Sequence, residues 1–244
     1  MNALRSILHL MFMAVTVIPW GLAVVIASPF LSSTQIYWMC VGWLRLAVRS
    51  GEVMLGIRNQ IIGYENLPVG SKDPAILLVK HQSTWETFVM PTLMPHPLAY
   101  VFKKELLYVP FFGWAMSRMD MIHIDRSKRK EAFNKVVSQG QRLLDQGTWV
   151  IMFPEGTRIA RGQQGTYKVG GTRLAVATGA PVIPIAVTSA KCWPRKALIK
   201  RPGTVEFSIG KPIPSQGRDP DELMREVEAW IEAEMRRLDP QAYR

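Results

Sequence analysis

The chain has 244 residues, of which 48% are hydrophobic, so it is long enough and apolar enough to fold rather than remain disordered. Its 30 Lys and Arg residues outnumber its 19 Asp and Glu residues, and the net charge of +11 favours polyanionic partners such as phosphorylated cofactors, anionic lipids or nucleic acids. Two distant cysteines, and four histidines without ligand-like spacing, indicate neither a disulfide framework nor a metal site.

The N-terminal part of the chain contains a long apolar segment, residues 7–31, without any formal charge. A helix of this length reaches roughly 37 Å, more than the hydrocarbon core of a bilayer at about 30 Å. Pro19 lies in its middle and predicts a kink or a break, so the segment either spans the bilayer or forms two short helices that dip into one leaflet. Aromatic residues followed by Arg45 and Arg49 are typical of a cytoplasmic head-group boundary.

A secretory signal peptide cleaved after Ala27 is an alternative interpretation of this segment. However, the apolar stretch is longer than the usual hydrophobic region of such a peptide, and only Arg5 marks a basic start. A buried helix of a soluble core is less favoured still, because the segment has no polar face. We therefore expect residues 1–50 to form a membrane-associating helical segment.

From residue 51 onward, hydrophobicity alternates between strand-like and helix-like periods without a repeat or a linker. This pattern predicts one α/β domain over residues 51–244, with a mixed, largely parallel central sheet flanked by helices. The expected strands are 57–64, 75–80, 98–103, 121–125, 148–153, 182–187 and 204–209. The expected helices are 84–93, 109–119, 128–145, 172–178 and 221–238, the last capped near Asp219.

The first candidate for chemistry is the pair His81 and Glu86, which follows the expected strand 75–80. Ser83 and Glu86 fit a capping box, and in that interpretation the histidine is an incidental loop residue. In the functional interpretation, Glu86 accepts a hydrogen bond from one ring nitrogen of His81 and orients it as a proton acceptor. Ser83 is too close to serve as a nucleophile, so the attacking hydroxyl would belong to a substrate.

The second candidate is the segment Phe-Pro-Glu-Gly-Thr-Arg at residues 153–158, which follows another expected strand. Gly156 permits a close approach of the backbone, Thr157 offers a hydroxyl, and the guanidinium of Arg158 suits a phosphate. Alone, such a segment is usually a surface turn with a solvated arginine. Two candidate sites at the ends of parallel strands favour a functional interpretation, because ligands bind at that edge of α/β sheets.

In their order along the chain, these segments resemble the glycerophospholipid acyltransferase family, specifically its bacterial 1-acyl-sn-glycerol-3-phosphate acyltransferases. The first family block, Asn-His-x₄-Asp, corresponds to residues 80–86, with Lys80 in place of the asparagine and Glu86 in place of the aspartate. The resemblance covers roughly residues 57–215, and four ordered blocks are more specific than one. The other matching segments are 101–106 continuing through Pro110, Gly113 and 124–126, then 153–158, then 180–185.

The resemblance implies an O-acyltransferase that moves a fatty acyl group from acyl-CoA or acyl carrier protein to the free hydroxyl of 1-acyl-sn-glycerol 3-phosphate, giving phosphatidic acid. No bound cofactor, metal or acyl-enzyme is implied. His81 would act as general base and Glu86 would orient it. Lys104 is expected on the opposite face of its strand and solvated. The residues implied for the phosphate site are Arg158, Lys103, Gly156, Thr157, Glu155 and Arg126.

These donors are cytoplasmic, so the resemblance implies a catalytic domain at the cytoplasmic face of the inner membrane. Its partners would be the lipid acceptor, the donor and the membrane surface, with no nucleic acid, since no nucleic-acid-binding motif is present. Another lysolipid acceptor such as lyso-ornithine lipid, a thioesterase that uses the same histidine and glutamate, and a non-catalytic basic protein are the alternatives.

Overall fold

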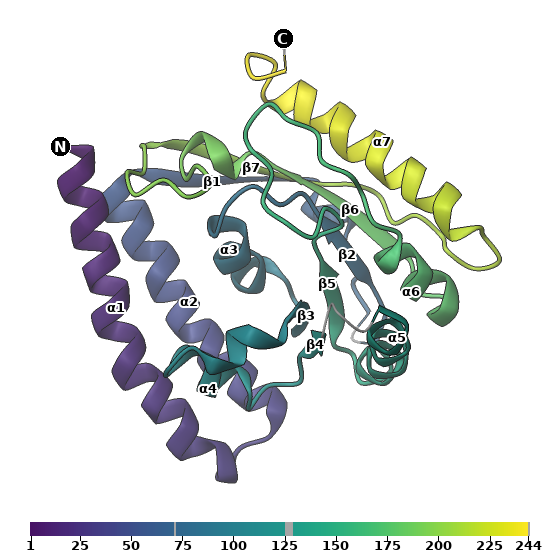
Figure 1. Cartoon of the computed structure of the whole chain (residues 1–244), viewed down its shortest axis with the longest axis horizontal. Coiled ribbons are helices and arrows are strands. Elements are labelled where there is room, and N and C mark those ends of the chain that lie inside the picture. Colours follow the sequence, from purple (N-terminus) through teal and green to yellow (C-terminus); the bar gives the residue numbers. More distant parts are fainter. Residues whose placement is uncertain (71, 125–128, 244) are drawn as a thin grey trace.

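The computed structural model describes residues 1–70, 72–124 and 129–243, without the side chains of residues 103, 124 and 129–135. The described residues form a seven-stranded sheet in the order β1-β7-β6-β2-β5-β3-β4 (Figure 1). The strands are β1 (Ile57–Ile62), β2 (Ile76–Val79), β3 (Leu98–Lys103), β4 (Ile122–Ile124), β5 (Trp149–Met152), β6 (Val182–Val187) and β7 (Gly203–Ile209). The helices are α1 (Asn2–Ala27), α2 (Ser33–Leu55), α3 (Trp85–Leu93), α4 (Phe112–Met116), α5 (Arg129–Asp145), α6 (Gly170–Thr178) and α7 (Pro220–Leu238).

Neighbouring strands are parallel, apart from the antiparallel pair β6 and β7. Strands β1 and β7 therefore run opposite to the other five. The predicted mixed, largely parallel sheet with flanking helices is confirmed. Strands β2 and β5 are direct neighbours and run the same way, so the two candidate sequences that follow them begin at the same edge of the sheet.

The sheet separates two apolar cores. On β2, Leu77 and Val79 pack in the core shared with α1, α2 and α3, whereas Ile76 and Leu78 pack in the core shared with α5, α6 and α7. All four side chains are fully buried. A parallel strand covered on both faces is apolar at every position, which explains why its sequence reads as a continuous hydrophobic run.

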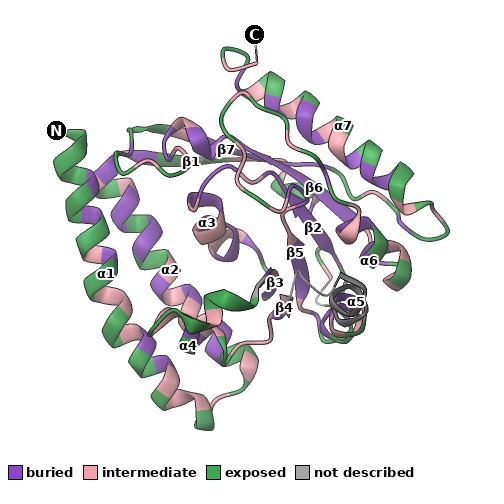
Figure 2. Cartoon of the chain, viewed as in Figure 1, coloured by how far each residue is buried: buried purple, intermediate pink, exposed green. Residues whose placement is uncertain are grey.

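Helices α1 and α2 form an antiparallel hairpin beside the sheet, and the chain reverses at a 3₁₀ turn (Ser28–Phe30) (Figure 1). Of the two expected outcomes at Pro19, a kink or a break, the break is wrong, because α1 continues to Ala27 with the proline inside it. Tertiary contacts hold the helix across this position: the Trp20 indole donates a hydrogen bond of 2.9 Å to the Met39 carbonyl on α2. The inner face of α1 packs on α2, and its outer face is exposed (Figure 2).

The segment between β3 and β4 differs most from expectation. A helix was expected over 109–119, but α4 covers only Phe112–Met116 and follows a 3₁₀ turn (Lys104–Tyr108). Phe111 has a φ of 62°, which no α-helical residue adopts, so the helix cannot extend across it. The carbonyl oxygen of Leu107 would lie 2.4 Å from a β-carbon at position 113, so only glycine fits this tight turn.

The remaining boundaries agree within about two residues. Strand β1 ends two residues before the expected 64, because Tyr64 begins a 3₁₀ turn (Tyr64–Asn66). Helix α7 is capped as expected, since the Asp219 carboxylate accepts hydrogen bonds from two backbone N–H groups of its first turn. The last expected residue of strand 121–125 and the first of helix 128–145 lie outside the described residues.

Candidate active site

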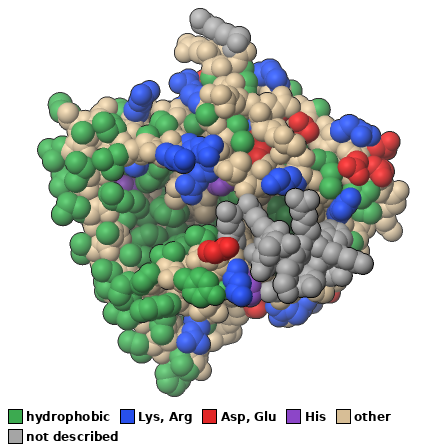
Figure 3. All heavy atoms as spheres, in the orientation of Figure 1, with side chains coloured by type: hydrophobic (Ala, Val, Ile, Leu, Met, Phe, Trp, Pro, Cys, Tyr) green, Lys and Arg blue, Asp and Glu red, His purple; other side chains and the backbone are tan. Residues whose placement is uncertain are grey.

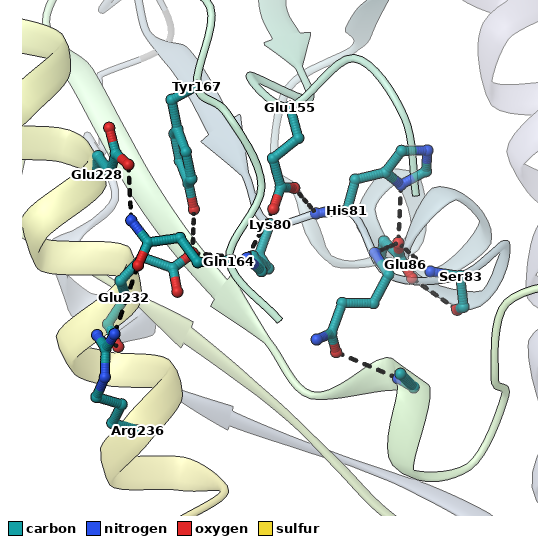
Figure 4. A network of polar contacts seen from close by, with 12 residues as sticks. Lys80, His81, Ser83, Glu86, Glu155, Gln164, Tyr167, Glu228, Glu232 and Arg236 are labelled. Carbon is teal, nitrogen blue, oxygen red and sulfur yellow. Dashed lines mark hydrogen bonds and ion pairs between the residues drawn. The ribbon is translucent and has the colours of Figure 1, made fainter. Parts of the chain in front are cut away.

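His81 and Glu86 are brought together where β2 leads into α3. The His81 Nδ1 atom lies 2.9 Å from Glu86 Oε1, and the imidazole side chain is 14% exposed (Figure 4). Glu86 belongs to the first turn of α3, and the short loop folds back so that its carboxylate reaches the ring. The predicted proximity of the two side chains is therefore present, although the replacement of aspartate lengthens the side chain by one methylene.

The Glu86 carboxylate also holds the loop backbone. Its Oε1 accepts hydrogen bonds of 2.7 Å from the N–H groups of Gln82 and Ser83, and its Oε2 accepts one from the Ser83 hydroxyl. Glu86 is fully buried. Burial opposes ionisation, but the hydrogen bond and the charge of His81 and the Ser83 backbone outweigh it and hold the pKa of the Glu86 carboxyl below its ordinary value. Glu86 thus holds the loop and orients the histidine with one carboxylate, but the expected capping box is not the cap of α3, whose N-cap is Thr84 without a side-chain hydrogen bond.

The loop after β5 fixes the backbone of His81 on both sides. The His81 N–H donates a hydrogen bond of 2.8 Å to Glu155 Oε2, and the His81 carbonyl accepts one of 2.8 Å from the Ile159 N–H. The ring of Phe153 stacks on the imidazole, with centroids 3.9 Å apart and planes inclined by 17°. These contacts leave the imidazole little freedom to move.

A cavity of about 1190 Å³ opens beside His81. Its inner wall is apolar and is formed largely by α1, α2 and the segment around α4, including Val17, Trp20, Val41 and Met116. Figure 3 shows this face hollowed, with hydrophobic side chains inside and Lys and Arg side chains along the upper rim. Among the residues whose side chains the structure describes, those with Lys or Arg side chains that line the cavity are Arg158, Lys168, Arg195 and Lys196.

The expected phosphate-site residues fall into three groups. Gly156, Thr157 and Arg158 line the cavity together with His81. Glu155 is buried and turns away from it, toward Lys80 (Figure 4). Burial raises the pKa of the Glu155 carboxyl, and the nearby Lys80 charge opposes that rise.

The two remaining residues expected in the phosphate site have side chains that the structure does not describe. Lys103 ends β3, but its side chain is not described, and Arg126 lies outside the described residues altogether. Lys104 is exposed at the start of the 3₁₀ turn, in keeping with the expected solvated side chain.

Lys168 was not expected from the sequence. Gly156 has a φ of 64°, and a β-carbon at this position would come within 2.9 Å of the Lys168 Nζ atom. The Lys168 N–H also donates a hydrogen bond of 2.9 Å to the Pro154 carbonyl. In the sequence Lys168 is one of several basic residues in a glycine-rich loop, and only the folded loop brings its ammonium group beside Gly156 at the cavity that Arg158 also lines.

Among the described residues, no group of three or more His, Cys, Asp or Glu side chains is arranged to hold a metal ion. Neither Arg158 nor Lys168 forms an ion pair with another described residue. Two cations without carboxylate partners, at a cavity that also contains an oriented imidazole, can bind an anionic substrate and remove a proton from it.

The fold and this arrangement define an acyltransferase. A family model described as acyltransferase matches residues 58–188, and the chain belongs to that family.

A 1-acyl-sn-glycerol-3-phosphate acyltransferase of Pseudomonas aeruginosa is 40% identical over 98% of this chain and 93% of its own length. A 1-acyl-sn-glycerol-3-phosphate acyltransferase of Saccharomyces cerevisiae is 34% identical over 70% of this chain and 57% of its own length. The crystal structure of the 1-acyl-sn-glycerophosphate acyltransferase PlsC from Thermotoga maritima superposes with a TM-score of 0.81 at 22% identity. That match covers 98% of this chain and 96% of the other, and it shows a shared fold.

Proposed function

We propose that this protein transfers a fatty acyl group from a thioester, on coenzyme A or on acyl carrier protein, to the free hydroxyl of 1-acyl-sn-glycerol 3-phosphate. The product is phosphatidic acid. One observation carries the proposal: His81, oriented by Glu86 at 2.9 Å, lines the same cavity as Arg158. The names of the relatives support the same acceptor.

His81 serves as the general base in the proposed reaction. The second ring nitrogen, Nε2, takes the proton of the acceptor hydroxyl as its oxygen attacks the thioester carbonyl, and Glu86 stabilises the imidazolium that forms. The carbon–sulfur bond breaks, and the imidazolium returns the proton to the departing thiolate. Because both substrates bind at once, no acyl-enzyme forms.

Arg158 and Lys168 bind the acceptor phosphate in this proposal. Both line the cavity, and the Lys168 ammonium lies beside Gly156 in the loop that carries Arg158. The Thr157 hydroxyl completes the phosphate pocket, and the absence of a side chain at Gly156 leaves room for the Lys168 ammonium group. Glu155 contributes indirectly, because it holds the loop against His81 from behind. Lys103 and Arg126 are proposed for the same phosphate on the family resemblance alone.

The apolar inner wall of the cavity suits acyl chains, and the exposed apolar face of α1 suits a lipid surface. One described helix with its following turn, Asn2–Phe30, is long and apolar enough to cross a membrane by length and composition, which suggests membrane association. Since α1 and α2 form a hairpin that returns to the sheet, we propose that residues 1–50 lie in one leaflet of the inner membrane. The domain of residues 51–244 would then face the cytoplasm, where the thioester donors are found.

The test is a transfer assay with the purified full-length protein, radiolabelled acyl-CoA and a panel of acceptors: 1-acyl-sn-glycerol 3-phosphate, lyso-ornithine lipid and phosphate-free monoacylglycerol. Label should appear in phosphatidic acid and depend on the first acceptor. His81→Ala should reduce the rate by about 10²–10⁴-fold or more and leave the fold intact. Release of free fatty acid without an acceptor would instead identify a thioesterase, and preference for lyso-ornithine lipid would correct the acceptor.

A further inference from the structure

A buried charged cluster lies behind the candidate site, on the side of the sheet that α7 covers. Lys80 directly precedes His81, and its side chain is fully buried. Its Nζ atom lies 2.6 Å from Glu155 Oε1 and 2.6 Å from Glu232 Oε1 (Figure 4). Glu232 belongs to α7, which lies outside the residues that the family model matches.

The cluster forms a continuous chain of contacts from α7 to His81. The Tyr167 hydroxyl donates a hydrogen bond of 2.8 Å to Glu232 Oε1, and Lys80 lies 5.7 Å from the centre of the Tyr167 ring. Lys80 bridges Glu232 to Glu155, and Glu155 accepts the hydrogen bond from the His81 N–H. None of these four side chains lines the cavity.

The cluster contains one basic group, on Lys80, and two acidic groups, on Glu155 and Glu232. One lysine faces two carboxylates, and burial makes any unpaired charge costly. Removing the Lys80 charge leaves two buried carboxylates facing each other, one of which holds the His81 backbone. Removing the Glu232 charge leaves a neutral pair of Lys80 and Glu155. Loss of the Lys80 charge should therefore disturb the His81 backbone more than loss of the Glu232 charge. Removing the Glu232 charge as well should reverse part of the damage caused by losing the Lys80 charge.

We propose that Lys80 and Glu232 are positioning residues, through which α7 fixes Glu155 and thereby the backbone of the catalytic histidine. The proposal rests on the proposed function, in which His81 is the base. Lys80 sets the place of the Glu155 carboxylate, and Glu232, held by Tyr167, sets the place of the Lys80 ammonium. A displacement of His81 by about 1 Å lowers turnover without removing any group that contacts substrate.

The experiment compares Lys80→Met, Glu232→Gln and the double variant with wild type, all as full-length protein. Lys80→Met should lower kcat on the order of 10²-fold, while the KM values for acceptor and donor stay within about threefold. Glu232→Gln should lower kcat only a few-fold, because its amide still accepts the hydrogen bond from Tyr167. The double variant should recover at least tenfold over Lys80→Met, a coupling expected for groups in one buried network.

A matched control is available in Asp239→Asn. Asp239 follows α7 and pairs with Arg161 at 2.7 Å, so this pair joins the same helix to the same long loop without touching Lys80 or His81. The control should lower the unfolding temperature and leave kcat unchanged. If stability alone mattered, Asp239→Asn and Glu232→Gln would lower kcat in proportion to their loss of stability.

Four outcomes would overturn the proposal: unchanged kcat in folded Lys80→Met, a change in KM alone, no recovery in the double variant, or an equal loss of kcat in the control. If Lys80→Met does not fold, Tyr167→Phe provides the kcat comparison, because it removes the hydrogen bond that holds Glu232, and wild-type kcat in folded Tyr167→Phe would count against the proposal. Failure of the proposed function can be distinguished from failure of this positioning proposal. If the proposed function is wrong, the wild-type protein transfers no acyl group, or His81→Ala remains active.

Discussion

At the scale of single residues, Glu86 joins two tasks that are usually separate. Its carboxylate accepts hydrogen bonds from the backbone of the loop and from the His81 ring, and it is fully buried. A substitution there disturbs both the start of α3 and the orientation of the imidazole. Stability and catalysis at this position can be separated through their dependence on pH.

We expect Glu86→Gln to lower stability most at neutral pH and least in acid. Folding depresses the pKa of this carboxyl, so near that pKa the native state binds fewer protons than the unfolded state. The stabilisation is therefore present above the ordinary carboxyl pKa and is lost as the pH falls through the depressed value. Unfolding temperatures of wild type and variant, measured from pH 7 to pH 3, should converge on acidification. A constant difference would contradict this assignment.

Arg158→Ala and Lys168→Ala should each raise the KM for a phosphate-bearing acceptor about tenfold, since a hydrogen bond to a charged group contributes roughly 1.5–3 kcal/mol. The measurement compares lysophosphatidic acid with monoacylglycerol, which lacks the phosphate. Neither substitution should affect the phosphate-free acceptor. Lys211→Ala, at an exposed residue outside the cavity lining, provides the control. An equal loss with both acceptors would show that the cation supports the fold rather than the phosphate.

The residue-scale predictions succeeded where the contact is local in sequence. His81 and Glu86 are five positions apart, and a strand followed by a helix start brings them together. The partners of Glu155 could not be predicted in the same way. Its side chain meets Lys80 and, through it, Glu232, which is 152 positions further along the chain than Lys80. A lysine next to a candidate base suggests a solvated or substrate-binding charge, and only the packed structure shows it to be fully buried.

At the scale of elements, the hairpin of α1 and α2 is part of the catalytic fold as well as a candidate membrane anchor. Met13, Tyr37 and Val41 belong to the same apolar core as the central strands. The outer face of α1 remains exposed and apolar, with Met11 at 57% and Val15 at 66%. One face of the helix therefore packs in the protein, and the other is exposed, as the proposed membrane attachment requires.

The double substitution Met11→Glu and Val15→Glu should weaken attachment to vesicles at least tenfold, because it places two charges where apolar side chains would enter the bilayer. The measurement is co-sedimentation of the full-length protein with vesicles. Val69→Glu changes an equally apolar and exposed residue, 98% exposed, in a loop away from α1. The control should sediment like wild type. Equal binding of both variants would exclude the outer face of α1 as the attachment surface.

The order and type of the elements followed from periodicity, because strands covered on both faces and amphipathic helices leave clear patterns. Two elements could not be placed in this way. Helix α1 continues through Pro19 because contacts with α2, such as that between Trp20 and Met39, compensate for the proline. The segment before α4 turns at Phe111, whose positive φ no pattern of hydrophobicity reveals.

At the scale of the whole molecule, the protein carries a net charge of +11, whereas its proposed substrates are anionic. In the proposed function, the basic side chains along the rim of the cavity attract the acceptor, the donor and an anionic lipid surface. The apolar face of α1 supplies an attraction that salt does not screen. Attachment to membranes should therefore have two separable parts.

Raising ionic strength from about 0.05 M to 0.5 M should weaken binding to anionic vesicles several-fold, because the Debye length falls well below 10 Å. Binding to zwitterionic vesicles should change little over the same range, since it depends on apolar contact. Co-sedimentation with the two kinds of vesicle at each salt concentration measures the electrostatic and the apolar contributions to binding. The same salt dependence on both kinds of vesicle would show that the net charge does not guide attachment.

Helix α1 forms one wall of the cavity through Val17, Trp20 and Val24 while it presents its other side outward. Deleting it to obtain a water-soluble enzyme for screening or crystallisation would thus open the pocket to solvent and uncover the apolar surface of α2. Polar replacements confined to its outer side are the sounder engineering route to a detergent-free preparation, since they leave the pocket closed.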